Sequence, residues 1–325
     1  MAEGRVGSEG TGELKEVEET KDSAGSEVSK ADDVGGDDSG DIDDKEPIDR
    51  EYVGARFDRL IRENRFTIAV VFPAVGALLL VASSEDLLPP ILAYNPFLIL
   101  LGTFVMRSPL LAGILPVLDR RAVIGLGVLV GYAYAIEIVG VLTGLPYGEF
   151  SYAIDLGPML FGTVPAGLPV FFVPLVLNSY LLGLLLLGER AESTTVRLLI
   201  VIATVLAIDL VLDPGAVAIG FWIYPNGGLY YGVPWTNYAG WVLSATVSVA
   251  LLDWTLSRSA VLKRLCRCEF ALDDLVSFVI LWGAINLLYL NWLPVAIAAL
   301  LMGGLLRTDR FDFQVFAPDR LVRGG

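Results

Sequence analysis

Residues 165–188 read PAGLPVFFVPLVLNSYLLGLLLLG, a stretch with no charged side chain. A helix needs roughly 20 apolar residues to cross the hydrocarbon core of a bilayer, so this stretch predicts a membrane span. Similar stretches recur along the chain, and 54% of its 325 residues are hydrophobic. The predicted spans are 66–82, 91–106, 122–142, 165–188, 198–213, 236–252, 272–292 and 293–306, with 108–118 as a re-entrant continuation of the second. The sequence therefore predicts an all-α, polytopic membrane helix bundle of about eight spans.

The positions of Lys and Arg predict the orientation of these spans. Basic residues precede the first span and follow the second, fourth, sixth and last, with Arg107 taken as the first residue after the second span. The alternate connections, 83–90, 143–164, 214–235 and the turn around Asn291, contain none. Because basic loops stay on the cytoplasmic side, we expect a multi-pass protein of the cell membrane with both termini in the cytoplasm.

The first 50 residues differ from the rest of the chain. They hold 17 acidic and 6 basic residues and almost no large apolar side chains, too little to bury a core. The expected organisation is a disordered acidic cytoplasmic tail (1–50), a transmembrane helical domain (51–310) and a C-terminal tail (311–325). No apolar signal sequence precedes the tail, so the first span is expected to direct insertion. An acidic tail together with a low lysine content also indicates a protein from a halophile.

Two connections without Lys or Arg are long and rich in Gly, Pro, Tyr and Trp. They are TGLPYGEFSYAIDLGPMLFGTVPAG (143–167) and DPGAVAIGFWIYPNGGLYYGVPWTN (213–237). Loops that only connect helices are usually short and polar. Two loops of this composition on the same side of the membrane favour a functional surface. The alternative is an interfacial aromatic belt.

Three acidic residues are predicted at similar depth just below these loops. With a rise of 1.5 Å per residue, Asp209 lies about 18 Å and Asp213 about 24 Å above Arg197, and Glu137 lies about 24 Å above Arg121. A charge inside hydrocarbon costs a few kcal/mol and usually marks function. The alternative for each acid is a helix cap or an interhelical hydrogen bond.

The chain has no histidine, which limits its chemistry. Di-iron membrane oxygenases and haem enzymes need histidine ligands, and no nucleotide-binding fingerprint is present. Two carboxyl groups, one protonated and one ionised, suit the addition of water to an alkene. Protonation of a trisubstituted double bond gives a tertiary carbocation, which aromatic faces stabilise. This chemistry requires neither a metal nor a cofactor.

Four stretches of the sequence resemble the CruF-type carotenoid hydratases of haloarchaea. They are EIVGVLTGLPYGEFSY (137–152), LG (156–157) followed by GTVP (162–165), DLVLDPGAVAIGFWIY (209–224) and GGLYYGVPWTNYAGW (227–241). The resemblance extends over about residues 120–255. It implies an integral membrane enzyme that adds water to the terminal double bonds of a long carotenoid in bacterioruberin biosynthesis.

The roles of individual residues follow from depth and chemistry. Asp209 or Glu137, the more deeply embedded acids, is the expected general acid, and Asp213 is expected to orient or deprotonate the nucleophilic water. The expected substrate-binding residues are Tyr147, Glu149, Asp155, Trp222, Tyr230, Tyr231, Trp235 and Asn237. The expected partners are a carotenoid within the bilayer, membrane lipids and other membrane enzymes of the carotenoid pathway, and no nucleic acid.

Two other functions remain open at this stage. Intramembrane acids could move protons in a transporter or lipid carrier, although the inner halves of the spans offer few polar residues. The spacing of DLVLD (209–213) could also hold magnesium diphosphate in a prenyltransferase. That enzyme needs a second acidic motif nearby, and the only other close pair, Asp273 and Asp274, is predicted on the opposite face.

Overall fold

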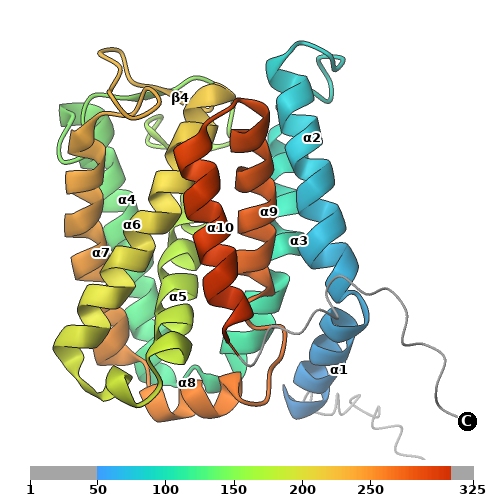
Figure 1. Ribbon diagram of the computed structural model, residues 1–325, viewed down its shortest axis with the longest axis vertical. Coiled ribbons are helices and arrows are strands. Elements are labelled where there is room, and N and C mark those ends of the chain that lie inside the picture. Colours follow the sequence, from blue (N-terminus) through green and yellow to red (C-terminus); the bar gives the residue numbers. More distant parts are fainter. Residues whose placement is uncertain (1–49, 309–325) are drawn as a thin grey trace, which may run out of the picture. The chain divides into compact units, whose positions relative to one another are not determined.

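The computed structural model describes residues 50–308, and side chains from Gly54 onward. In this range the chain forms ten α-helices, three short helical turns and four two-residue strands (Figure 1). The predicted tails lie outside the described residues, except that Arg50 begins the first helix. The expected domain boundaries therefore stay predictions.

The element bounds are α1 (Arg50–Glu63), η1 (Thr67–Val71), α2 (Phe72–Ser84), α3 (Pro96–Ile114), η2 (Leu115–Val117), α4 (Arg120–Thr143), β1 (Ser151–Tyr152), β2 (Met159–Leu160), β3 (Val164–Pro165), α5 (Leu168–Leu187), η3 (Gly188–Glu192), α6 (Thr194–Ala218), β4 (Trp222–Ile223), α7 (Trp235–Thr255), α8 (Arg258–Leu265), α9 (Asp273–Leu288) and α10 (Trp292–Leu306).

All eight predicted spans fall on helices, which confirms the membrane helix bundle. Within residues 50–308, five segments are long and apolar enough to cross a bilayer: Thr67–Ser84, Pro96–Val117, Arg120–Thr143, Leu168–Glu192 and Thr194–Ala218. A sixth consists of α7 and α8 together, which meet at a bend of 90°. The shorter helices α9 and α10 have 16 and 15 residues.

The second predicted span was wrong in its bounds. The helix α3 begins at Pro96, where the side chain of Asn95 accepts hydrogen bonds from two backbone N–H groups of the first turn. Asparagine at the N-cap followed by proline is a strong start signal. The helix then continues to Ile114, so 108–118 is part of the span and does not form a re-entrant piece. As a result, Arg107 lies within the helix and not after it.

The fifth span also extends beyond its predicted end, because α6 passes through Pro214. Proline has no N–H, so the carbonyl of Leu210 loses its helical partner. The Tyr230 hydroxyl donates to this carbonyl at 3.1 Å. Inside a membrane such a freed carbonyl needs a replacement donor, and Tyr230 supplies it one turn from Asp213.

The connections between helices gather at two ends of the bundle (Figure 1). One end, here called the loop end, carries the connections 144–167 and 219–234 and the turn between α9 and α10. The opposite end carries α1 and α8. Basic residues at this opposite end include Arg56, Arg59 and Arg62 on α1, Arg65 after it, and Arg190, Arg258, Lys263, Arg264 and Arg267. The fold thus shows the grouping that the Lys and Arg pattern predicted.

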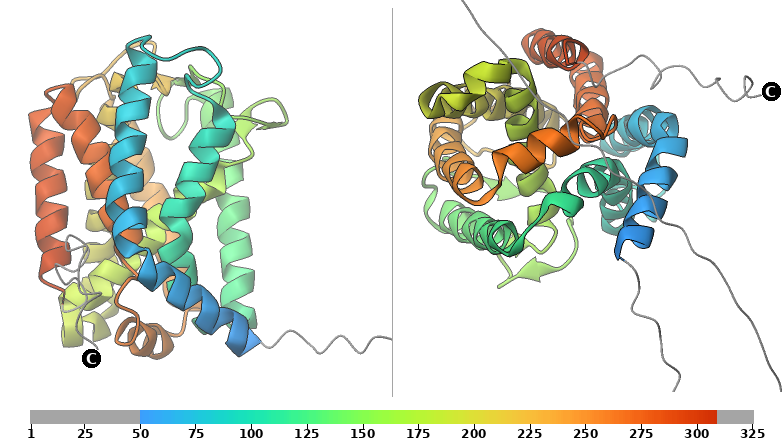
Figure 2. Two further views of the ribbon diagram at one scale, coloured as in Figure 1. Left: turned by 90° about the vertical axis from the view of Figure 1, so that its right-hand side faces the viewer. Right: turned by 90° about the horizontal axis from the view of Figure 1, so that it is seen from below.

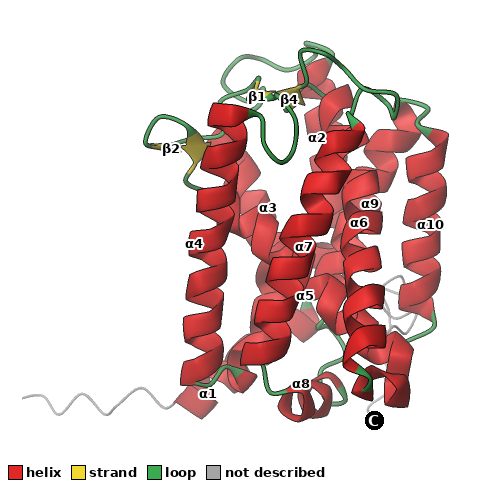
Figure 3. Cartoon of the chain, turned by 90° about the vertical axis from the view of Figure 1, so that its left-hand side faces the viewer, coloured by secondary structure: helices red, strands yellow, loops and turns green. Residues whose placement is uncertain are grey.

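The two aromatic loops are joined by backbone pairing at the loop end. The strands β1 and β4 run antiparallel, with Ser151 opposite Ile223 and Tyr152 opposite Trp222 (Figure 3). Beneath them α5 forms the centre of the bundle, where every residue from Pro174 to Leu184 is buried. A helix that is apolar on all sides is expected in such a position.

Candidate active site

Asp209 and Asp213 lie one turn apart on α6, as their spacing predicts. Both are buried. The side-chain amide of Asn237, from α7, donates to Oδ2 of Asp209 at 3.2 Å and to Oδ2 of Asp213. No ion pair between described residues involves either carboxyl group. Two carboxylates this close repel each other, so the arrangement favours one proton between them.

Glu137 lies near the loop end of α4, a helix that ends at Gly144 in the left-handed conformation. The hydroxyl of Tyr152, held over α4 by the β1–β4 pairing, donates to Oε1 of Glu137. Burial, followed by the charge of Glu137, raises the pKa of the Tyr152 hydroxyl well above its usual value. Tyr152 therefore remains a protonated donor to the carboxyl group.

A cavity of about 170 Å³ lies beneath the two loops. Glu137, Asp213 and Asn237 all line it. Along α5 its lining runs from Leu168 to Asn178, a length of about 15 Å. Its aromatic lining residues are Tyr147, Phe150, Tyr152, Phe171, Phe172, Phe221, Trp222, Tyr224, Trp241, Phe278 and Trp282. Two acids from different helices thus face one largely apolar space.

Aromatic rings form the walls next to the acids. Phe172 stacks on Trp241 with ring centroids 5.4 Å apart, and Tyr147 lies 6.0 Å from Trp241. Phe150 lies 6.2 Å from Tyr224. Because the faces of aromatic rings attract cations, this wall can stabilise a positive charge that develops close to the carboxyl groups.

Tyr147 is fixed between two helices that carry glycine at the contact. Its hydroxyl bonds to Oγ of Ser244 at 2.6 Å. A Cβ atom added at Gly240 on α7 would lie 2.5 Å from the Tyr147 ring, and one added at Gly140 on α4 would lie 3.1 Å from it. Only glycine allows both backbones to approach the ring this closely.

We expect Gly240→Ala to displace Tyr147 and to lower the free energy of unfolding by about 1–3 kcal/mol, the range for overpacking a fitted interior. Any activity of this site should fall with it, because Tyr147 lines the cavity. Unfolding in detergent, followed by tryptophan fluorescence, measures the change. Gly131→Ala is the matched control, because a Cβ atom there meets nothing within 4 Å. It should be neutral, or stabilise the helix by up to about 1 kcal/mol. Equal stability of the two variants would contradict the prediction.

The structure brings six of the predicted site residues together. Five line the cavity: Glu137, Asp213, Tyr147, Trp222 and Asn237. Asp209 lies behind this lining and contacts it through Asn237. The remaining predicted residues lie away from the cavity: Glu149, Asp155, Tyr230, Tyr231 and Trp235.

The five distant residues have other surroundings. Glu149 is exposed and accepts a bond from Asn226 at 3.4 Å, and Asp155 accepts one from the nearby backbone N–H of Gly157. The Tyr231 hydroxyl accepts a bond from the backbone of α10, and Trp235 is 77% exposed. Tyr230 bonds to α6, as described above. Their predicted contacts with substrate stay predictions.

Several lining residues were not singled out from the sequence, above all Tyr152 and Phe150. A signal for them was present: in extended chain, residues two apart point to the same side. The rings of Phe150 and Tyr152 are 5.8 Å apart. Pairing of this segment with Trp222–Ile223 was the missing information, since two-residue strands leave no periodicity to detect.

Comparison with known proteins agrees with the resemblance of the loop motifs. The family described as "Carotenoid biosynthesis protein" matches residues 94–305. A bisanhydrobacterioruberin hydratase from Haloarcula japonica is 66% identical over 261 residues, which cover 80% of this chain and 89% of the relative. No solved structure matches the chain. The chain therefore belongs to the carotenoid biosynthesis protein family, and its relationship to the CruF-type carotenoid hydratases is confirmed.

Proposed function

We propose that this protein is a membrane hydratase that adds water to the terminal C=C bonds of a long-chain carotenoid in bacterioruberin biosynthesis. The observation that carries the proposal is that Glu137 and Asp213 face one aromatic-lined cavity. That cavity lies beneath the two loops whose motifs resemble the hydratases. The name of the Haloarcula relative supports the same reaction and the same class of substrate.

Glu137 is the proposed general acid. It lines the cavity, whereas Asp209, the other candidate from the sequence, does not. Because Tyr152 donates to Oε1 of Glu137, Oε2 is left to carry the transferable proton. Transfer of this proton to the less substituted alkene carbon breaks the π bond and leaves a tertiary cation, which the aromatic wall stabilises.

Asp213 is the proposed base. As the water oxygen bonds to the cationic carbon, Asp213 takes one of the water protons, and the product is a tertiary alcohol. The proton then returns from Asp213 to Glu137 through water, so each cycle consumes one double bond and one water molecule. Asn237 and Asp209 are positioning residues: the shared amide holds the Asp213 carboxylate at the cavity wall.

We also propose that the loop end faces the outside and that both termini are cytoplasmic. The connections at the loop end contain no Lys or Arg, whereas α1, α8 and the connections at the opposite end contain several. The positive-inside rule supports this orientation. Water then reaches the acids from the outer surface, and the carotenoid reaches them from the bilayer.

No contact in residues 54–308 favours the alternative functions. A proton path across the membrane would need available acids towards the α8 end, and a prenyltransferase would need a second acidic motif close to Asp209 and Asp213. Three acids in that half are instead paired with arginines: the partly buried Asp253 with Arg197, the buried Asp273 with Arg65 and the buried Asp274 with Arg107.

The proposal is tested by incubating membranes that carry the protein with an anhydro-carotenoid in ¹⁸O-labelled water. We expect one labelled hydroxyl oxygen for each double bond that is hydrated, measured by mass spectrometry of the separated pigments. Membranes with Glu137→Gln plus Asp213→Asn serve as the control and should give no labelled product. A pigment that stays unchanged with the native protein would overturn the proposal, and is the result expected of a transporter or a prenyltransferase.

A further inference from the structure

A long-chain carotenoid is larger than the cavity that holds the acids. By a measure in which one water takes about 10–15 Å³, a cavity of about 170 Å³ accommodates roughly a dozen heavy atoms. A long-chain carotenoid has several times as many carbon atoms. If its end group lies beside Glu137 and Asp213, the rest of the chain has to leave the cavity through one of its walls.

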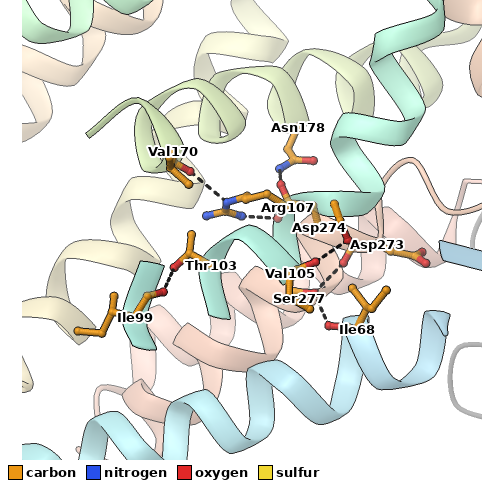
Figure 4. Close-up of polar contacts among 11 residues, drawn as sticks. Ile68, Ile99, Thr103, Val105, Arg107, Val170, Asn178, Asp273, Asp274 and Ser277 are labelled. Atoms are coloured by element: carbon orange, nitrogen blue, oxygen red, sulfur yellow. Dashed lines mark hydrogen bonds and ion pairs between the residues drawn. The ribbon is translucent and has the colours of Figure 1, made fainter. Parts of the chain in front are cut away.

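Figure 4 shows a polar cluster of Arg107, Asp274 and Asn178, and two of its members, Arg107 and Asn178, line the cavity. Arg107 on α3 pairs with Asp274 and donates through Nε to the carbonyl of Val170 at 3.3 Å. Asn178 on α5 donates to the other oxygen of Asp274 at 2.6 Å. A hydrocarbon chain passing this point would have to separate a buried ion pair, which is strongly unfavourable. The chain therefore has to leave through a side wall.

Most side walls are closed by helices that pack directly on one another. The packed pairs around the cavity include α4 with α7, α6 with α7, α5 with α6, and α3 with α2 and α9. By contrast, α3 and α4 both pack on α5 and are not among the directly packed pairs. Figure 2 shows α3 slanting away from α4. Among the described helices, α3 and α4 are therefore packed less closely on each other than the pairs named above.

The hairpin β2–β3 covers the interval between α3 and α4 at the loop end. The Tyr134 hydroxyl on α4 donates to the carbonyl of Ala166 at 2.6 Å. On the other side, Gly167 lies so close to α3 that an added Cβ atom would be 2.8 Å from the Leu100 side chain. Residues 166 and 167, which follow the β2–β3 hairpin, therefore lie against both α4 and α3.

Cavity-lining residues beside this interval are partly exposed, as are several lining residues on α2, α4, α6 and α7. Ile99 on α3 and Leu168 and Phe171 on α5 line the cavity and remain partly exposed. Deeper on α5, Phe172 and Leu175 line the cavity and are buried. The surface next to this interval is apolar, as expected of a wall that faces hydrocarbon chains.

We infer that the polyene chain of the carotenoid leaves the cavity sideways between α3 and α4, beneath the β2–β3 hairpin, and contacts Ile99, Leu168 and Phe171. This inference rests on the proposed function. The opening fits an apolar chain because these three side chains are hydrocarbon. It also lets a carotenoid dissolved in the bilayer present one end to the acids without leaving the membrane.

The test narrows the opening with Ile99→Trp and, separately, Leu168→Trp. Each variant is assayed with a long anhydro-carotenoid and with a short alkene that has the same end group and fits inside the cavity. We expect kcat/KM for the long substrate to fall by about tenfold or more, as for overpacking of a fitted apolar site. Turnover of the short alkene should fall much less than that of the long substrate, because the short alkene does not pass the opening. Leu101→Trp is the matched control on α3, because Leu101 is 62% exposed and does not line the cavity.

Native turnover of both substrates by the two narrowing variants would overturn the inference. If the native protein converts neither substrate, the proposed function itself fails. A variant that loses both substrates is replaced by a labelling experiment with Ile99→Cys and Leu101→Cys in membranes treated with N-ethylmaleimide. Bound carotenoid should slow alkylation at position 99 several-fold and leave position 101 unchanged. Equal protection at both positions, or at neither, overturns the inference.

Discussion

Glu137→Gln and Asp213→Asn are each expected to lower the rate of carotenoid hydration by about 10²–10⁴, the usual contribution of a positioned acid or base. Both substitutions keep the size of the side chain, and glutamine can still accept the Tyr152 hydrogen bond. Only the transferable proton or the proton acceptor is lost. Chromatography of the pigments over time, at equal amounts of folded protein, measures the effect.

Acids outside the cavity provide the comparison. Glu149→Gln and Asp155→Asn should keep the native rate, because both side chains are exposed and neither lines the cavity. Asp209→Asn should lower the hydration rate less than Asp213→Asn does, since Asp209 acts through Asn237 and does not reach the substrate. Full conversion of the carotenoid by the Glu137→Gln variant would show that Glu137 is not the general acid. A larger loss of hydration rate in Asp209→Asn than in Glu137→Gln would assign that role to the aspartate pair.

The convergence of these acids was predictable from the sequence, because it depends on local geometry. Helix rise fixes depth, and a spacing of four residues fixes the common face of Asp209 and Asp213. A long stretch without charged residues, such as 165–188, also has to lie in the membrane or in the interior of the bundle. The helices and the approximate level of the site therefore follow from quantities that can be counted along the chain.

The partners of the acids were less predictable, because they depend on contacts between distant segments. Tyr152 reaches Glu137 because it lies in a two-residue strand that pairs with Trp222–Ile223. So short a strand has no alternating hydrophobic pattern from which the pairing could be predicted. The hydroxyl of Tyr230, an expected substrate-binding residue, bonds to the carbonyl that Pro214 frees, a contact that the sequence did not predict. The predicted fifth span ended at Asp213, just before this proline, because sequence alone does not show that a replacement donor is available.

The interior position of Arg107 was missed for a related reason, since arginine near the end of an apolar stretch normally marks the membrane surface. In this fold it pairs with Asp274, which is fully buried. The pairing links residues 167 positions apart in the chain. A partly buried arginine and a buried aspartate at this separation could be matched only after the helices had been placed.

Arg107→Met is expected to lower the free energy of unfolding by about 3–5 kcal/mol, because it leaves the buried Asp274 carboxylate without its cation. The hydrogen bond from Asn178 remains but cannot neutralise a charge. Unfolding in mixed detergent, followed by fluorescence, measures the loss. Arg120→Gln is the matched control: Arg120 is exposed at the start of α4, so its change should stay within about 0.5 kcal/mol.

Combining Arg107→Met with Asp274→Asn separates the charge from the packing. If the uncompensated carboxylate causes the loss, the double variant should regain most of the stability, since a buried ion pair often contributes little beyond what neutral side chains of similar size provide. No recovery would show that the methylene chain of Arg107 and its bond to Val170 carry the stability instead. A stable double variant also lacks the charges of Arg107 and Asp274 at the end of the cavity. Its carotenoid turnover therefore shows whether these charges are needed for the polyene to leave sideways between α3 and α4.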